Sequence, residues 1–191
     1  MAGRIVILNG APRSGKSSIA RALQASVDHA WINFGVDAAM AMTPKRLQPG
    51  IGLRPGGERP DLEPFVRQCY AAAFDSISAH SRLGLDVVGD FGIHEGHSRP
   101  LGVWEDMQRR FAGLPLLTVG VLCDLETIMA RRNADPQAQG QSYAAGEGVP
   151  APVRRWQEAV HAGKTYDLTV DTGRMAPEDC AAVIAARLAG S

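Results

Sequence analysis

Short apolar runs alternate with amphipathic stretches along the chain. The run Leu116–Leu122 (LLTVGVL) is almost continuously apolar, which is typical of a strand buried on both faces of a parallel sheet. Similar runs predict five strands, at about residues 4–9, 31–35, 85–90, 116–123 and 166–171. Between them, apolar residues at helical spacing predict helices near residues 16–27, 62–82, 101–112, 124–133, 152–162 and 177–189. This alternation predicts an α/β fold in which helices wrap a mostly parallel sheet.

The last predicted helix has a clear start signal. Pro177 fits the first helical turn, and the acidic residues that follow it suit the positive end of the helix dipole. Helical spacing predicts that this helix buries a stripe made of Cys180, Val183, Ile184 and Leu188.

Two stretches interrupt the pattern. Residues 44–60 are rich in proline and glycine, and residues 134–151 are short of bulky apolar side chains. Long irregular segments inside a compact domain are usually functional or disordered. We find no internal repeat, so we expect one domain over residues 1–191 with two insertions rather than two domains.

Composition and charge narrow the class of protein. The 191 residues are 45% hydrophobic and 21% charged, with 20 basic and 20 acidic side chains. No basic face is implied, so nucleic acid is not a favoured partner. The three cysteines are widely spaced, which favours free thiols over a disulfide framework or a zinc site. No apolar run reaches membrane-spanning length and none resembles a secretory signal, so we expect a cytoplasmic protein with no membrane partner.

A complete G-x-x-x-x-G-K-S phosphate loop follows the first predicted strand and opens the first predicted helix. In such a loop the backbone N–H groups and the helix dipole converge on an anion. Lys16 can reach the β- and γ-phosphates, and the Ser17 hydroxyl can ligate Mg²⁺. The motif therefore predicts ATP and Mg²⁺ as cofactors, bound by Gly10, Ala11, Pro12, Arg13, Ser14, Gly15, Lys16, Ser17 and Ser18.

Two aspartates follow predicted strands at the edge where ligands bind in open α/β sheets. Asp37 lies two residues beyond Gly35, where it can accept a hydroxyl proton during phosphoryl transfer or cap a helix over residues 38–42. Asp90 can hold Mg²⁺ through water, orient an acceptor, or simply accept hydrogen bonds from loop N–H groups. Gly89 interrupts the apolar run before it, so the segment is not a regular Walker B element.

Further candidates lie on the predicted loops and helix ends. Arg131 and its neighbour Arg132 can fold over the phosphates, or they can be a solvated helix end. His94 and His97 sit in a glycine-rich loop, where lining an acceptor pocket is a better interpretation than metal binding, since no third ligand is assured. Trp156 and the other tryptophans are expected in the core or in a pocket wall.

Several elements together resemble the chloramphenicol phosphotransferase family. They are Ile-Leu-Asn-Gly before the loop, Phe34-Gly35-Val36-Asp37, Val121-Leu122-Cys123-Asp124, and Tyr166-Asp167 followed by Val170-Asp171-Thr172. The resemblance implies a three-layer P-loop kinase fold with a five-stranded parallel sheet in the order 2-3-1-4-5. It also implies ATP-dependent phosphorylation of an antibiotic hydroxyl, with Asp37 as the general base.

The kinase hypothesis assigns further roles from the placement of these residues, and the resemblance to the family has gaps. Lys16 and Arg131 would stabilise the transferring group, while Asp90, Phe91 and His94 would face the acceptor. The insertion at about 44–60 would lie on the acceptor side, and a lid would span about 131–153. The lid is poorer in arginine than that of the family's chloramphenicol enzyme, and the loops expected at the acceptor differ. The acceptor is therefore predicted only as a small-molecule alcohol.

Two other functions stay open at the level of sequence. A nucleotide kinase would need arginines for the acceptor phosphate, and the candidates are Arg46, Arg54, Arg59 and Arg67. A nucleotide-dependent regulatory protein is the third reading, although the chain has no Asn-Lys-x-Asp guanine element. The sequence leaves open whether the chain forms a homo-oligomer.

Overall fold

Five parallel strands form the centre of the computed structural model, which describes residues 1–190 except 26–29, 49–54 and 135–147. The strands are β1 (Ile5–Asn9), β2 (Trp31–Asn33), β3 (Asp86–Phe91), β4 (Leu116–Leu122) and β5 (Leu168–Asp171). Their order is β2-β3-β1-β4-β5, which confirms the predicted topology. The all-buried strand β1 lies in the middle, paired with β3 and β4.

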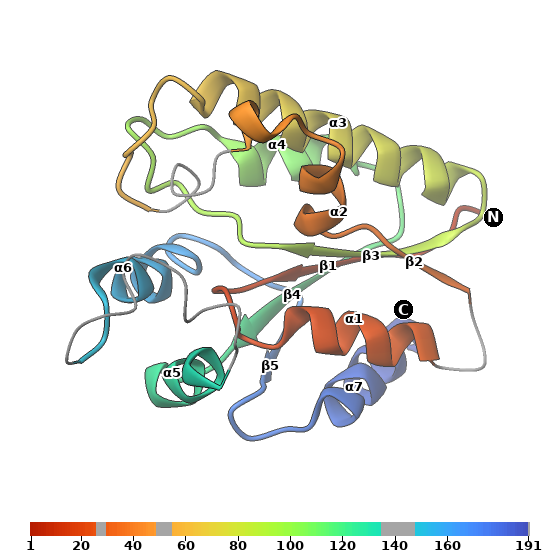
Figure 1. The fold of residues 1–191 in the computed structure, drawn as a ribbon. Coiled ribbons are helices and arrows are strands. Elements are labelled where there is room, and N and C mark those ends of the chain that lie inside the picture. The colour runs from red at the N-terminus through yellow and green to blue at the C-terminus, as the bar shows by residue number, and fades with distance from the viewer. Residues whose placement is uncertain (26–29, 49–54, 135–147, 191) are drawn as a thin grey trace.

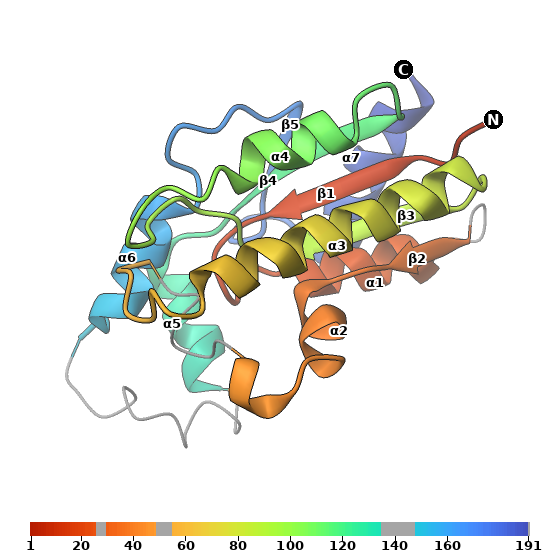
Figure 2. The same cartoon turned by 90° about the horizontal axis from the view of Figure 1, so that it is seen from above.

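Helices cover both faces of the sheet. Helices α1 (Lys16–Ala25) and α7 (Pro177–Ala189) lie on one face, and α3 (Glu63–Arg82) and α4 (Val103–Arg110) lie on the other (Figure 1). Helices α5 (Leu125–Asn133) and α6 (Ala151–Ala159) lie beyond the carboxyl ends of the strands, as the view from above also shows (Figure 2). This edge is therefore where the site is expected.

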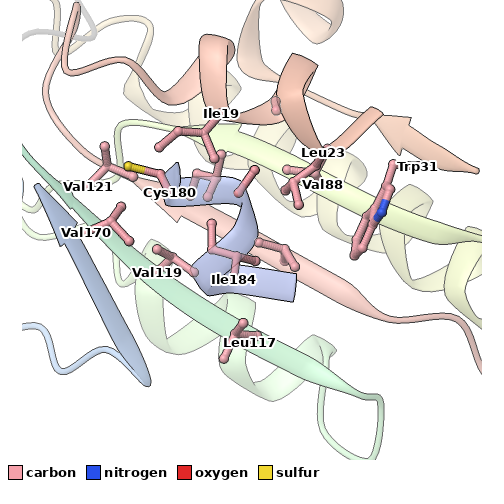
Figure 3. Close-up of a cluster of buried hydrophobic side chains, with 14 residues drawn as sticks. Ile19, Leu23, Trp31, Val88, Leu117, Val119, Val121, Val170, Cys180 and Ile184 are labelled. Atoms are coloured by element: carbon pink, nitrogen blue, oxygen red, sulfur yellow. The ribbon is translucent and has the colours of Figure 1, made fainter. Parts of the chain in front are cut away.

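Apolar side chains fill both layers between sheet and helices. On the α1 and α7 side, Ile19, Leu23 and Ile184 pack on the strand residues Val88 and Val119 (Figure 3). Complete burial of each such side chain contributes about 1.5–3 kcal/mol relative to exposure. The opposite layer is built mainly from α3, α4 and β3, with Phe74, Phe91 and Phe111 in edge-on contact.

The helix stripe predicted for residues 177–189 is partly wrong. Cys180 and Ile184 are fully buried and Leu188 packs against the same cluster, but Val183 is 39% exposed. Ala181 takes its place at the interface with α1. At 3.6 residues per turn Ala181 falls on the same side of α7 as Cys180, Ile184 and Leu188, whereas Val183 falls outside that arc.

Short elements after β2 were missed or blurred by the sequence pattern. Helix α2 (Val36–Ala41) has no buried residue, and its N-cap is Gly35, without a side-chain cap. A single 3-10 turn, η1 (Lys45–Leu47), follows it inside the segment predicted as an irregular loop. Because neither element buries an apolar stripe, periodicity gave no signal for them. No helix among the described residues is long and apolar enough to cross a membrane.

Candidate active site

The phosphate loop links β1 to α1 through a tight turn. Arg13 and Gly15 both have left-handed backbone conformations, with φ of 66° and 92°. Such conformations are uncommon for a non-glycine residue, and turns of this kind direct successive N–H groups into one concavity that suits an anion. The Ser14 hydroxyl is buried and has no hydrogen-bond partner within the described part of the chain. The loop thus has the shape and the spare donor capacity that a phosphate would satisfy.

Lys16 begins helix α1 and is almost fully buried at the loop. Its Nζ donates to the Ala11 carbonyl at 2.9 Å and lies 3.7 Å from Asp90 Oδ1. Burial lowers the pKa of Lys16, while the nearby carboxylates of Asp90 and Asp37 oppose that shift. The ammonium is therefore held among oxygen atoms at the mouth of the loop, where it can turn to a phosphate.

Ser17 and Asp90 form a direct pair beside this lysine. The Ser17 hydroxyl donates to Asp90 Oδ2 at 2.5 Å, so Asp90 is bound by a side chain and not by the loop N–H groups that were one alternative. A hydroxyl next to a carboxylate is the oxygen-rich donor set that Mg²⁺ prefers when phosphates supply other ligands. The residues present fit a Mg²⁺ ion at this position.

Arg131 and Thr172 hold the phosphate loop through hydrogen bonds, and sequence reasoning had given Thr172 no role. Its guanidinium donates to the Arg13 carbonyl at 3.2 Å and to the Thr172 hydroxyl and carbonyl at 3.1 and 2.7 Å. The Thr172 hydroxyl in turn donates to the Ser14 carbonyl at 2.6 Å. Thr172 ends the Val-Asp-Thr element already noted, but no spacing rule placed it against a loop 158 residues away. Arg131 is therefore a part of the loop's support.

Two cavities open on the phosphate loop from opposite sides and share Arg13, Lys16 and Ser17. The first, of about 350 Å³, continues along Ser18, Arg131, Thr172 and Pro177. The second, of about 380 Å³, continues along Val36, Asp37, Tyr70, Asp90, Gly92 and Trp156. The loop thus stands between two spaces, and each is lined by a different set of elements.

Asp37 lies in the second cavity on the first turn of α2. It is exposed and has no side-chain hydrogen bond to any described residue, and its negative charge acts to raise the pKa of Lys16. Because α2 begins at Val36 and its N-cap is Gly35, the alternative of Asp37 as a helix N-cap is wrong. The structure brings Asp37, Asp90, Lys16 and Ser17 together around one space.

An apolar pocket continues from the second cavity between α2 and α3. It shares Val36 and Tyr70 with that cavity and also contains Phe91 and Cys69. Burial raises the pKa of the Tyr70 phenol, with a smaller contribution from Glu95. Tyr70 therefore stays protonated and can donate a hydrogen bond at the junction of the two spaces. The predicted acceptor residue Phe91 lines this apolar part.

His94 does not line the cavity directly. It is buried, accepts a hydrogen bond from the Gly96 N–H on Nδ1, stacks on His97 and meets the ring of Trp156 edge to face. Within the described residues no cluster of His, Cys, Asp or Glu is arranged to hold a metal ion. Trp156 lines the second cavity, which fits the expected role of a pocket wall. His94 packs edge to face against the Trp156 ring.

The arginines predicted to clamp an acceptor phosphate lie elsewhere. Arg59 forms a bidentate pair with Asp61, and Arg67 faces a separate groove between α3 and α4. Arg46 lies in η1 and lines neither cavity, while Arg54 is outside the described residues. Apart from the phosphate loop's own Arg13 and Lys16, the second cavity has no cationic lining among the described residues.

Comparison with known proteins agrees with this geometry. Residues 3–189 match the family described as "Chloramphenicol phosphotransferase-like protein". No curated protein sequence matches the chain.

Solved structures share the fold at low sequence identity. A sugar kinase from Janibacter sp. HTCC2649 is 18% identical with a TM-score of 0.63, covering 98% of this chain and 95% of its own. The Mycobacterium tuberculosis APS kinase CysC, in complex with AMPPNP and APS, is 16% identical with a TM-score of 0.61, covering 100% and 99%. A tunicamycin resistance protein from Deinococcus radiodurans is 20% identical with a TM-score of 0.61, covering 97% and 95%. These likenesses show a P-loop kinase fold.

Proposed function

The chain belongs to the chloramphenicol phosphotransferase-like family, and from this premise we propose that it transfers the γ-phosphate of ATP to a hydroxyl group of an uncharged small molecule. One observation carries the proposal: the phosphate loop lines two cavities, and among the described lining residues only the second cavity has carboxylates, Asp37 and Asp90, whose charges act on Lys16. A kinase needs a nucleotide on one side of the transferred group and an acceptor on the other.

In this proposal ATP occupies the cavity of Arg131 and Thr172, with its triphosphate across the loop. Ser17 and Asp90 would hold Mg²⁺, which would supply positive charge to offset that of the phosphates. The Lys16 ammonium would leave the Ala11 carbonyl for the phosphates. Arg131 would act mainly by holding the loop in shape, because its guanidinium is bound to the Arg13 and Thr172 carbonyls.

The acceptor would lie in the second cavity with its hydroxyl between Asp37 and the γ-phosphate. The hydroxyl oxygen attacks phosphorus as the bond to the β-phosphate oxygen breaks, and the hydroxyl proton passes to the Asp37 carboxylate. The products are ADP and a phosphate ester. Positioning and charge stabilisation supply most of the rate in this class of reaction.

The lining of the cavity favours an uncharged acceptor with an apolar part. The apolar pocket next to Tyr70 suits a ring or alkyl group, and the described lining offers no arginine clamp for a second phosphate or a carboxylate. This favours an alcohol such as an antibiotic over a nucleoside monophosphate. Chloramphenicol is one candidate and the family name makes it the first to test.

The experiment is a screen of alcohols and nucleoside monophosphates with ATP and Mg²⁺, in which mass spectrometry detects the gain of one phosphate. We expect Asp37→Asn to bind ATP normally and to lose about 10²–10⁴ in turnover, the usual contribution of a positioned base. Asp61→Asn is the matched control, because Asp61 is an exposed aspartate paired with Arg59 away from the cavity.

Each outcome has a definite meaning. Normal turnover by Asp37→Asn would exclude Asp37 as the base. Phosphorylation of nucleoside monophosphates alone would replace the proposal with a nucleotide kinase. ATP hydrolysis without any phosphorylated acceptor would favour the regulatory reading.

A further inference from the structure

A buried amide side chain holds three separate segments together at the end of strand β1. Asn9 is fully buried and is the last residue before the phosphate loop. Its Nδ2 donates to the Tyr166 hydroxyl at 2.9 Å and to the Val160 carbonyl at 3.0 Å, with a longer contact of 3.4 Å to the Ile93 carbonyl. Its Oδ1 accepts from the Ile93 N–H at 2.6 Å. Both ends of the amide are therefore engaged.

Two of the three partner residues of Asn9, Ile93 and Val160, lie next to walls of the second cavity. Ile93 follows Gly92, which lines the cavity, and Val160 caps the C-terminus of α6, the helix that carries Trp156. The packing between these walls is close, since a Cβ atom on Gly92 would lie 3.0 Å from the Trp156 ring. The position of this tryptophan relative to the loop thus depends on where the two backbone segments are held.

Among the described residues few other hydrogen bonds attach α6 at this edge, and the Tyr166 hydroxyl reaches the Val160 carbonyl only at 3.5 Å. Gln157 donates to the Cys123 carbonyl at 2.7 Å, while the pair between Arg155 and Glu58 is exposed and 3.3 Å long. Exposed pairs of this kind contribute little. The buried bond from Asn9 to Val160 therefore carries much of the polar attachment of α6 to the sheet.

We infer that Asn9 is a positioning residue for the acceptor side of the site: its amide sets the Gly92 and Trp156 walls relative to the phosphate loop. The expected effect of Asn9 on phosphate transfer rests on the proposed function. The expected effect on the positions of Gly92 and Trp156 does not. The side chain contacts neither cavity itself, so it acts through the segments that it holds.

The first test needs neither nucleotide nor acceptor. Trp31 and Trp104 are buried and Trp156 is partly exposed, so quenching of tryptophan fluorescence by acrylamide reports mainly on Trp156. The variant Trp156→Phe measures how much of the quenched fluorescence comes from Trp156. We expect Asn9→Ala to raise the quenching of Trp156 at a temperature where the variant is folded. The matched control is Asn33→Ala, because Asn33 also ends a strand but is exposed and makes one bond of 3.5 Å.

A second variant keeps the size of the side chain. In Asn9→Asp the carboxylate can still accept from the Ile93 N–H, but it faces the Val160 and Ile93 carbonyls without a proton to donate. We expect increased Trp156 quenching at pH 8 and partial recovery at lower pH, when the carboxyl group regains one donor. His161 Nδ1 lies 2.9 Å from the Tyr166 hydroxyl and also titrates, so the native protein is measured over the same pH range. A reversal seen only in Asn9→Asp would not arise from a role in stability alone.

The kinetic arm separates the acceptor from the nucleotide. We expect Asn9→Ala to lower kcat/KM for a phosphorylated alcohol by about 10²-fold, the cost of a misplaced site of order 1 Å, while its Kd for ATP stays close to that of the native protein. Unchanged Trp156 quenching in both folded variants, or equal losses for ATP and acceptor, would overturn the inference. A native protein that phosphorylates no alcohol would overturn the proposed function alone, since the quenching experiment stands without it.

Discussion

Replacement of Thr172 by valine tests how much the brace behind the phosphate loop contributes. Valine keeps the shape of the side chain but removes the hydroxyl that donates to the Ser14 carbonyl at 2.6 Å and accepts from Arg131 at 3.1 Å. Thr172 is 5% exposed, so water cannot easily replace the lost partner. A buried carbonyl left without its donor costs about 1–3 kcal/mol.

The contacts that Arg131 keeps in Thr172→Val lower the expected cost in stability. Arg131 keeps its bonds to the Thr172 and Arg13 carbonyls, so we expect a loss of about 1–2 kcal/mol in the free energy of unfolding. For a chain of this length 1 kcal/mol corresponds to about 2–4 °C, which gives a decrease in Tm of about 2–8 °C. A loosened loop must be reordered by its ligand, and a cost of about 1.4 kcal/mol would weaken ATP binding about tenfold.

The assay combines thermal unfolding with calorimetric titration of ATP. The control is Thr169→Val in strand β5, just before Thr172, where the threonine is exposed and the change is expected to stay within about 0.5 kcal/mol. If Thr172→Val matched this control in both Tm and ATP affinity, the brace would contribute nothing and the reasoning would be refuted.

Two further predictions concern Glu63, which binds Ser98, and the cavity wall at Gly92. Burial raises the pKa of Glu63, but hydrogen bonds from Ser98 and the charges of His97 and Arg99 outweigh it and hold the pKa below its ordinary value of 4.5; the stabilisation is present above pH 4.5 and is lost as the pH falls through the lower folded-state pKa. Thermal unfolding from pH 7 to 3 should therefore show Glu63→Gln losing less stability in acid than the native protein, and parallel curves would contradict this. Gly92→Ala should displace the Trp156 ring, because the new Cβ would lie 3.0 Å from it. We expect a higher KM for the acceptor and an unchanged ATP affinity in calorimetry. The control is Gly190→Ala, whose Cβ would have its nearest neighbour 3.8 Å away, and equal KM values for the two variants would exclude the effect.

The sheet and its loop were predictable because local rules dominate there. The short apolar runs of β1 and β4 are typical of strands buried on both faces. The phosphate loop is a motif of consecutive residues, so it can be recognised without knowledge of the fold. Strand limits were less accurate: the run at 31–35 predicted five residues where Trp31–Asn33 has three. Strand β2 ends at Asn33 and the chain then turns toward α2. The hydrophobic pattern alone does not show where the strand ends.

The supports of the site could not be predicted, because they connect distant parts of the chain. Asn9 was visible only as a polar residue that ends an apolar strand, and its partners lie 84, 151 and 157 residues away. Thr172 was part of a recognised element without an assigned role. His94 was expected on the acceptor, yet it packs against Trp156. In each case the sequence shows a polar side chain, but only the folded structure determines which group it contacts.

The resting partners of Lys16 have a consequence for turnover. Its ammonium is already engaged by the Ala11 carbonyl and lies near Asp90, so nucleotide capture is an exchange of one set of oxygens for another. The net gain on binding is smaller than the attraction between lysine and phosphate alone. If the chain acts as proposed, the same exchange would run in reverse after transfer, when the Lys16 ammonium returns to the Ala11 carbonyl as ADP leaves.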